Sequence, residues 1–208
     1  EITPTLSKYA LKFDAISVRE DSAIKLCQKY LKTDAVQVLD PTFLLDTTDY
    51  LKLVEQMNEN VEIGNNRACV YILDMNKHKQ DIIREVLKTK KLTLHRIGKP
   101  TKKGFPSIES WINGFDKSEF IITDSFHGTV FAILFNKPFI SIVNEGRGTT
   151  RFTSLLKLFG LSKRLITPTT NPQKIKEIIS SPINYNEVNQ ILSVQRDLSK
   201  SFLINILK

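Results

Sequence analysis

The segment 120–129 constrains the fold of this chain more than any other part of the sequence. Residues 120–123, Phe-Ile-Ile-Thr, are mostly apolar and β-branched or aromatic, which is typical of a strand buried in a parallel sheet. Asp124 or Ser125 can cap a helix that begins directly afterwards, and the apolar run 129–135 predicts that this helix packs inward. The segment therefore predicts a strand, a polar turn and a helix of an α/β fold.

The first turn of that helix carries His127 and Gly128. Backbone N–H groups at a helix N-terminus attract anions. The histidine adds a proton donor, and the glycine lets a ligand approach the backbone. We therefore expect an anion site at the C-terminal edge of the sheet.

Strand and helix patterns alternate in two series, 15–45 and 68–167. This alternation predicts the α/β class, with a Rossmann-like parallel sheet and helices on both faces. The first series has too few strands for a complete domain, so residues 1–45 are expected to be the end of an N-terminal domain. The rest is expected to form a linker at 46–67, a C-terminal Rossmann-like domain at 68–183 and a C-terminal helix at 184–208.

The charge of the chain favours anionic partners. Its 208 residues carry a formal net charge of +8 and a pI of about 9.4, which suits phosphorylated small molecules, nucleic acid or an anionic membrane surface. The alternative is a lysine-rich solvated surface, because many lysines are scattered over helical positions. Nucleic acid is not an expected partner, since the lysines are not clustered with interleaved aromatic residues.

Cysteine content and hydropathy favour a cytoplasmic protein. Cys27 and Cys69 lack CxxC spacing and a nearby histidine pair, so we expect two buried free thiols in a reducing compartment. No run approaches the ~18 apolar residues of a membrane span, and residues 1–6 do not resemble a signal peptide. No metal site is expected, because His78 and His95 have no carboxylate or cysteine at ligand spacing.

Several motifs together resemble one known family. In chain order they are Ile16–Glu20, Val38–Leu45, Ile121–Thr129, Phe135–Ile140, Arg147-Gly148, and Arg151-Phe152 followed by Leu155-Leu156. Each motif alone is weakly specific. Their joint order and spacing resemble the later half of the polysaccharide pyruvyl transferase family, over nearly the whole chain.

This resemblance implies a GT-B-like fold, in which two Rossmann-like domains face a cleft. Most of the first domain would be missing here, and the C-terminal helix would cross back to that domain. The implied activity is transfer of a pyruvyl group from phosphoenolpyruvate to sugar hydroxyls, with ketal formation, in exopolysaccharide biosynthesis at the cell surface. Phosphoenolpyruvate is then the donor substrate, and no cofactor is expected. The acceptor would be a saccharide, often lipid-linked, which places the protein at the inner face of the membrane with peripheral contact.

The resemblance also implies site residues. His127 is the candidate general acid or phosphate ligand, and Arg19 is a candidate clamp for a carboxylate or phosphate. Ser125 and Phe126 would offer backbone N–H groups, and Gly128 would allow close approach. The structural alternatives are that His127 only orients the turn and that Arg19 pairs with neighbouring acids, Glu20 or Asp21.

This chain departs from the family pattern at Ser125, where many members carry an arginine. Arg147 and Arg151 flank a glycine loop and are candidates to supply the cation; otherwise they pair with acids such as Glu145. Asp124 is expected to be a helix cap rather than a base.

Two other classes of function remain open. A GT-B glycosyltransferase that uses a nucleotide-sugar donor would need a carboxylate for the ribose at the sheet edge, and Glu145 is the candidate. A non-enzymatic basic domain that binds anions would need clustered cations. Binding of phosphoenolpyruvate rather than a nucleotide sugar separates the pyruvyl transferase from the glycosyltransferase. A salt-dependent binding assay separates the basic binding domain from both enzymes.

Overall fold

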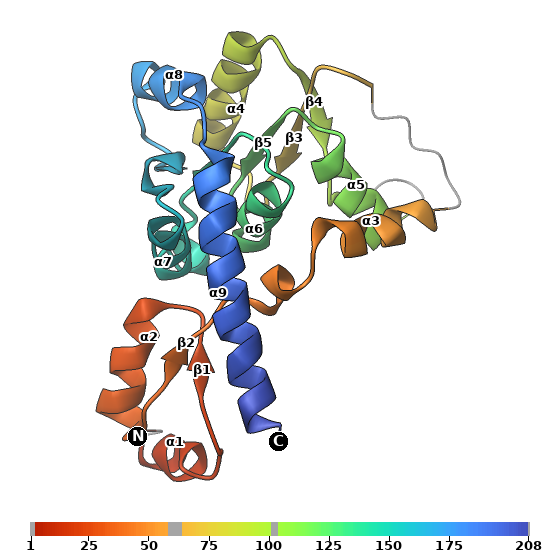
Figure 1. The fold of residues 1–208 in the computed structure, drawn as a ribbon. Coiled ribbons are helices and arrows are strands. Elements are labelled where there is room, and N and C mark those ends of the chain that lie inside the picture. Colours follow the sequence, from red (N-terminus) through yellow and green to blue (C-terminus); the bar gives the residue numbers. More distant parts are fainter. Residues whose placement is uncertain (1–2, 58–63, 101–103, 208) are drawn as a thin grey trace.

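The computed structural model describes residues 3–57, 64–100 and 104–207. Its largest sheet has five parallel strands in the order β4-β3-β5-β6-β7 (Figure 1). These strands are β3 (Arg67–Tyr71), β4 (Thr93–Arg96), β5 (Phe120–Thr123), β6 (Phe139–Ile142) and β7 (Leu165–Ile166). β4 lies on one side of β3 and β5 on the other, so the chain order reverses between β3 and β5. In open α/β sheets the carboxyl ends of the strands at such a reversal form the usual ligand crevice.

Helices cover both faces of this sheet. α4 (Lys77–Lys90) and α8 (Pro172–Ser180) bury their apolar residues on one face, against β3, β5 and β6. α5 (Ile108–Asp116), α6 (Phe126–Leu134) and α7 (Thr150–Leu158) pack on the other face. All residues of β5 and β6 are buried, as expected of strands covered on both faces. The α/β class and the parallel sheet predicted from the sequence are confirmed.

The N-terminal residues form a smaller unit with its own parallel pair of strands. It contains α1 (Thr3–Ala10), β1 (Ser17–Val18), α2 (Asp21–Leu26), the π-helix η1 (Cys27–Leu31), β2 (Val36–Gln37) and the 3-10 helix η2 (Pro41–Leu44). Both strands are shorter than their apolar patterns at 15–18 and 36–39 suggest. In the described part of the chain, β1 and β2 pair only with each other in their two-stranded sheet. Their ladder of hydrogen bonds ends at the bond from the N–H of Val38 to the carbonyl of Val18, at 2.9 Å.

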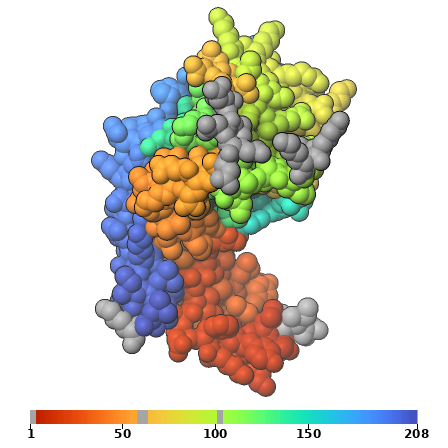
Figure 2. Space-filling model, turned by 90° about the vertical axis from the view of Figure 1, so that its right-hand side faces the viewer, coloured from red at the N-terminus to blue at the C-terminus, as the bar shows by residue number. Residues whose placement is uncertain are grey.

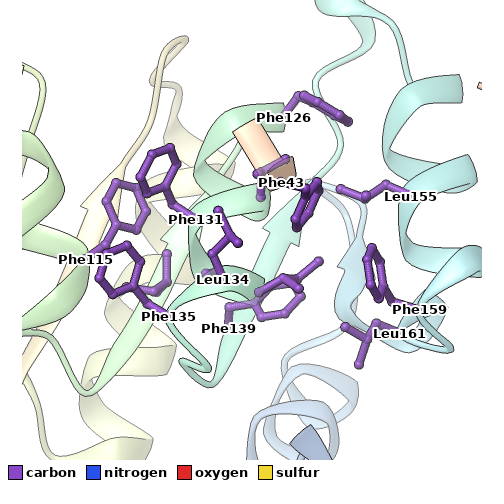
Figure 3. Close-up of a cluster of buried hydrophobic side chains, with 14 of the residues drawn as sticks. Phe43, Phe115, Phe126, Phe131, Leu134, Phe135, Phe139, Leu155, Phe159 and Leu161 are labelled. Atoms are coloured by element: carbon purple, nitrogen blue, oxygen red, sulfur yellow. The ribbon is translucent and has the colours of Figure 1, made fainter. Parts of the chain in front are cut away.

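One aromatic side chain fixes this unit to the larger one. Phe43 of η2 is fully buried among the core side chains on the α6 face of the large sheet (Figure 3). Its ring centroid lies 5.5 Å from that of Phe159. Burial of a phenylalanine contributes about 1.5–3 kcal/mol, so η2 is held firmly in place.

Residues 46–67, expected to be a linker, include a helix that belongs to the larger core. α3 (Thr47–Glu55) begins with a capping box formed by Asp46 and Asp49. Its residues Tyr50, Leu51 and Val54 pack against the core on the α6 face. The sequence pattern places a helix at 49–58, so the helix begins two residues earlier than expected. Residues 58–63 lie outside the described part of the chain.

The long helix α9 (Tyr185–Ile206) links the two units (Figure 1). Val188 and Leu192, in its first half, belong to the large core. In its second half, the hydroxyl of Ser199 accepts a hydrogen bond from the N–H of Leu39 at 2.9 Å. Figure 2 shows the N-terminal unit as a lobe below the larger one, with an indentation between them on the right.

Candidate active site

The turn between β5 and α6 has the predicted geometry. Ser125 is the N-cap of α6, and its Oγ accepts a hydrogen bond from the N–H of Gly128 at 3.3 Å. The N–H of Ser125 donates to Oγ1 of Thr123 at 3.0 Å. The backbone donor of Ser125, considered above as a ligand contact, is therefore engaged within the turn. Asp124, the other candidate for the cap, is not the N-cap of α6.

Gly128 is buried and faces the sheet. A Cβ atom built on it would lie 2.2 Å from Oγ1 of Thr123, which is far inside van der Waals contact. Close packing of α6 on β5 therefore accounts for the glycine by itself. The approach of a ligand to this backbone, expected from the sequence, is not needed to explain it.

Three cationic or potentially cationic side chains surround the ring of Phe126. The guanidinium carbon of Arg19 lies 5.7 Å from the ring centroid, and that of Arg151 lies 5.5 Å from it. The imidazole of His127 lies 5.5 Å from the same ring, centroid to centroid. Arg19 follows β1, His127 begins α6 and Arg151 lies in the first turn of α7. The fold thus brings together three residues that were predicted separately.

Asp40 lies between Arg19 and His127, and sequence reasoning missed it. Its Oδ2 accepts a hydrogen bond from Nη1 of Arg19 and lies 3.8 Å from Nε2 of His127. Its Oδ1 accepts from the N–H and hydroxyl of Thr42, at 3.0 and 2.7 Å. Burial alone raises the pKa of Asp40, but the hydrogen bonds from Thr42 and Arg19 outweigh it and hold the pKa below its usual 3.8. The carboxylate is therefore charged at neutral pH.

Arg151 carries the least compensated charge of this cluster. Its Nη2 donates to the carbonyl oxygen of Arg147 at 2.8 Å. Among the described residues no ion pair includes Arg151, whereas Arg19 is paired with Asp40. The side chains of Arg19 and His127 remain 39% and 50% exposed, so both can reach a ligand from solvent. This cluster around Phe126 is suited to an anion.

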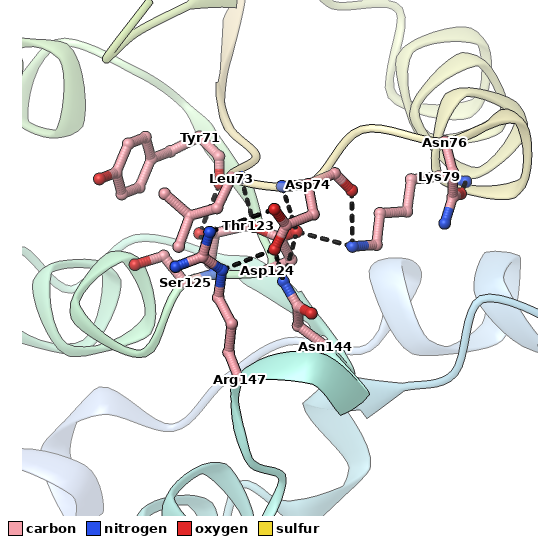
Figure 4. A network of polar contacts seen from close by, with 10 residues as sticks. All are labelled: Tyr71, Leu73, Asp74, Asn76, Lys79, Thr123, Asp124, Ser125, Asn144 and Arg147. Atoms are coloured by element: carbon pink, nitrogen blue, oxygen red, sulfur yellow. Dashed lines mark hydrogen bonds and ion pairs between the residues drawn. The ribbon is translucent and has the colours of Figure 1, made fainter.

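A second polar network lies at the carboxyl ends of β3 and β5 (Figure 4). Asp124 is fully buried there; Oδ1 accepts from the N–H of Leu73 at 2.7 Å, and Oδ2 accepts from Nζ of Lys79 at 2.7 Å. Nδ2 of Asn144 donates to Oδ2 of Asp124 at 3.1 Å and to Oδ2 of Asp74 at 2.7 Å. Asp124 is thus the centre of a buried network, not a cap.

Arg147 joins this second network rather than the cluster around Phe126. It lies in the 3-10 turn η3 (Glu145–Arg147) and donates Nε and Nη2 to the two carboxylate oxygens of Asp74, at 2.6 and 3.1 Å. Hydrogen bonds from Arg147 and then Asn144 hold the pKa of Asp74 far below its usual range. The structural alternatives were that Arg147 pairs with an acid such as Glu145, and Arg19 with Glu20 or Asp21. Both arginines are ion-paired, but with acids distant in sequence.

The remaining sequence expectations concern thiols, metals and membranes. Cys27 and Cys69 are free and buried, as predicted. Within the described ranges, no group of three or more His, Cys, Asp or Glu side chains is arranged to hold a metal ion. Among the helices there, none combines the length and apolar character needed to cross a bilayer.

Fold and site together define a class: an α/β protein with a cationic cluster at the carboxyl edge of its strands. Comparison of the sequence with known protein families then identifies the family. The chain belongs to the polysaccharide pyruvyl transferase family, whose sequence model matches residues 3–146. This range contains Arg19, Asp40 and His127.

No curated protein matches the chain. A solved structure described as "Crystal Structure Analysis of the Glycotransferase of kitacinnamycin" is similar, with a TM-score of 0.45 and 13% sequence identity. The similarity covers 74% of this chain and 46% of that protein, so the chain spans less than half of that protein's length.

Proposed function

We propose that this protein transfers a pyruvyl group from phosphoenolpyruvate to hydroxyls of a saccharide, in the synthesis of cell-surface polysaccharide. The family membership supports a transferase that acts on polysaccharide. The observation that carries the choice of donor is the convergence of Arg19, His127 and Arg151 around Phe126.

The donor has the charge and shape that such a cluster can bind. Phosphoenolpyruvate carries a phosphate and a carboxylate a few bonds apart. Guanidinium groups bind both of these groups with paired, charge-assisted hydrogen bonds. Arg19 and Arg151 come from different units of the fold yet lie beside the same ring. One arginine for each anionic group is the simplest assignment.

The proposed reaction needs one proton at carbon and one at phosphate. The vinyl carbon of phosphoenolpyruvate takes a proton and becomes a methyl group, while a sugar hydroxyl adds to the carbon that bears the phosphate. The phosphate then leaves with the electron pair of its C–O bond, and a second hydroxyl of the sugar adds to close the ketal. The two sugar hydroxyls together release two protons. This number equals the one proton gained by the methyl group plus the one that leaves with hydrogen phosphate.

His127 is the residue best placed to assist these proton transfers. Its imidazole is half exposed, begins α6 and has its Nε2 3.8 Å from Oδ2 of Asp40. It can act as the general acid or bind the leaving phosphate. The saccharide acceptor, its lipid linkage, contact with the membrane surface and a cytoplasmic location are parts of the same proposal.

Isothermal calorimetry with phosphoenolpyruvate and with nucleotide sugars tests this function. We expect wild type to bind phosphoenolpyruvate and His127→Ala to lose about tenfold or more in affinity, as for a lost charge-assisted contact. His78→Ala, on the exposed side of α4, is the matched control and should bind like wild type. Binding of a nucleotide sugar with no binding of phosphoenolpyruvate would refute the proposed donor and favour a glycosyltransferase.

A further inference from the structure

We propose that Asp40 is a positioning residue that holds Arg19 and His127 together as one anion site. This inference rests on the proposed function only for the identity of the ligand. The close approach of Asp40 to Arg19 and His127 is itself a property of the fold. Oδ2 of Asp40 faces Nη1 of Arg19 and, at 3.8 Å, Nε2 of His127.

The carboxylate is held rigidly on its other side. Its Oδ1 accepts hydrogen bonds from the N–H and the hydroxyl of Thr42, at 3.0 and 2.7 Å. Asp40 is also the N-cap of η2, which the buried Phe43 fixes in the core. A carboxylate with both its backbone and one oxygen fixed can orient the groups that meet its second oxygen.

Asp40 is buried, so it can affect a ligand only through its neighbours. Its side chain is only 4% exposed, whereas those of Arg19 and His127 are 39% and 50% exposed. A ligand that arrives from solvent therefore meets the arginine and the histidine and not the carboxylate. The carboxylate also repels anions less than an exposed one would, because Arg19 neutralises it.

The position of Asp40 also explains why a site forms between the two units. Arg19 follows β1 and Asp40 follows β2, and these two strands are parallel, so their carboxyl ends lie together. His127 follows β5, a strand of the other sheet. Asp40 thus connects the carboxyl edge of the small sheet with that of the large one.

Asp40→Asn separates the charge of this residue from its structural role. Asparagine keeps an oxygen for the hydrogen bonds of Thr42 and remains a good N-cap. It places an amide N–H group where Oδ2 now accepts from Arg19. We expect a loss of about tenfold or more in phosphoenolpyruvate affinity, as when one partner of a close charge pair is removed. Asp40→Glu, which restores the carboxylate, should recover part of it.

A double-mutant cycle distinguishes positioning from general destabilisation. If Asp40 acts through Arg19, then Asp40→Asn should cost much less affinity in an Arg19→Ala background than in wild type. Asp81→Asn is the matched control: it removes an exposed carboxylate that pairs with Nη1 of Arg84 on α4, outside the cluster. This control should leave the affinity unchanged.

Nitrogen NMR of the ligand-free protein tests the positioning independently of the donor. We expect the guanidinium of Arg19 to rotate more slowly in wild type than in Asp40→Asn. The signal of Arg19 is assigned by its absence from the spectrum of Arg19→Lys. Equal rotation rates, or fully additive losses of affinity in the cycle, would overturn the role of Asp40. Faster rotation in Asp40→Asn in a protein that binds no phosphoenolpyruvate would uphold the positioning and reject only the proposed donor.

Discussion

At the scale of single residues, Gly128 determines how closely α6 can approach β5. Its missing side chain leaves room for Thr123, whose Oγ1 donates to the carbonyl of Tyr71 at 2.7 Å and accepts from the N–H of Ser125. The same approach places His127 next to Asp40. A methyl group at residue 128 therefore disturbs both packing and the candidate site.

We expect Gly128→Ala to lower the free energy of unfolding by about 1–3 kcal/mol, the usual cost of overpacking. Urea titration followed by circular dichroism measures this change. Gly146→Ala is the control, because the nearest atom to its new Cβ would be Oδ1 of Asn144 at 3.8 Å. An equal effect of both substitutions would mean that contact with Thr123 is not the cause.

Asp40 should make stability depend on pH in the acid range. Its pKa in the folded protein lies below the usual value of 3.8, so its contribution to stability is present above that pH and is lost as the pH falls through the folded pKa. The stability difference between wild type and Asp40→Asn should thus be constant near neutral pH and shrink below pH 3.8. Urea titrations over this range measure it; a difference that persists in strong acid would contradict this assignment.

At the scale of elements, the Lys79–Asp124 pair ties a helix to a sheet edge. Asn76 caps α4 by accepting from the N–H of Lys79 at 2.9 Å. The ammonium of Lys79 then reaches the carbonyl of Asp74 and the carboxylate of Asp124, at 2.9 and 2.7 Å. Both charged side chains are almost completely buried. The pair thus fixes the first turn of α4 relative to the carboxyl ends of β3 and β5.

Lys79→Met should destabilise the protein by about 3–5 kcal/mol, because it leaves a buried carboxylate without its counter-charge. Lys88→Met, on the exposed face of the same helix, should change stability by about 0.5 kcal/mol or less. Chemical denaturation of both variants provides the comparison. A loss of less than about 1 kcal/mol for Lys79→Met would show that the N–H donors and Asn144 alone suffice to stabilise Asp124.

At the scale of the whole molecule, α9 holds the two units together through Arg196. Its guanidinium donates to the carbonyls of Phe43 and Leu45, at 2.6 and 3.1 Å, and pairs with Asp46 at 2.5 Å. The candidate site needs this alignment, because Arg19 and Asp40 belong to the N-terminal unit whereas His127 and Arg151 belong to the larger one.

Arg196→Ala should therefore loosen residues 38–45 and weaken phosphoenolpyruvate binding severalfold, although Arg196 is not in the site. Hydrogen–deuterium exchange should accelerate in this segment and not in β5 or β6, since local opening follows local contacts. Lys200→Ala, an exposed residue of the same helix, is the control. Equal exchange in wild type and Arg196→Ala would show that Arg196 is not needed to hold the two units together.

Much of the large sheet and part of the site could be predicted from local pattern. The strand at 120–123, the cap at Ser125 and the inward helix follow from apolar runs and capping chemistry, which depend on neighbouring residues. The apolar patterns at 15–18 and 36–39 indicate longer strands than the observed β1 and β2, because the length of a strand depends on how many strands pair with it. Asp40 was not predicted as a site residue. Its only local signal was its position after a strand, followed by Pro41.

The sequence by itself determined the α/β class, the turn that presents His127 and membership of the family through motifs in order. Only the tertiary structure decided which charges meet. Arg147 pairs with Asp74, 73 residues away, because β3 and the β6–η3 turn share one edge of the sheet. Arg19, Asp40 and His127 meet because the carboxyl ends of two separate sheets face each other. Ion pairs form only between groups that lie a few ångströms apart in space. The order of strands in the sheet sets these distances, and that order differs from the order of the strands along the chain.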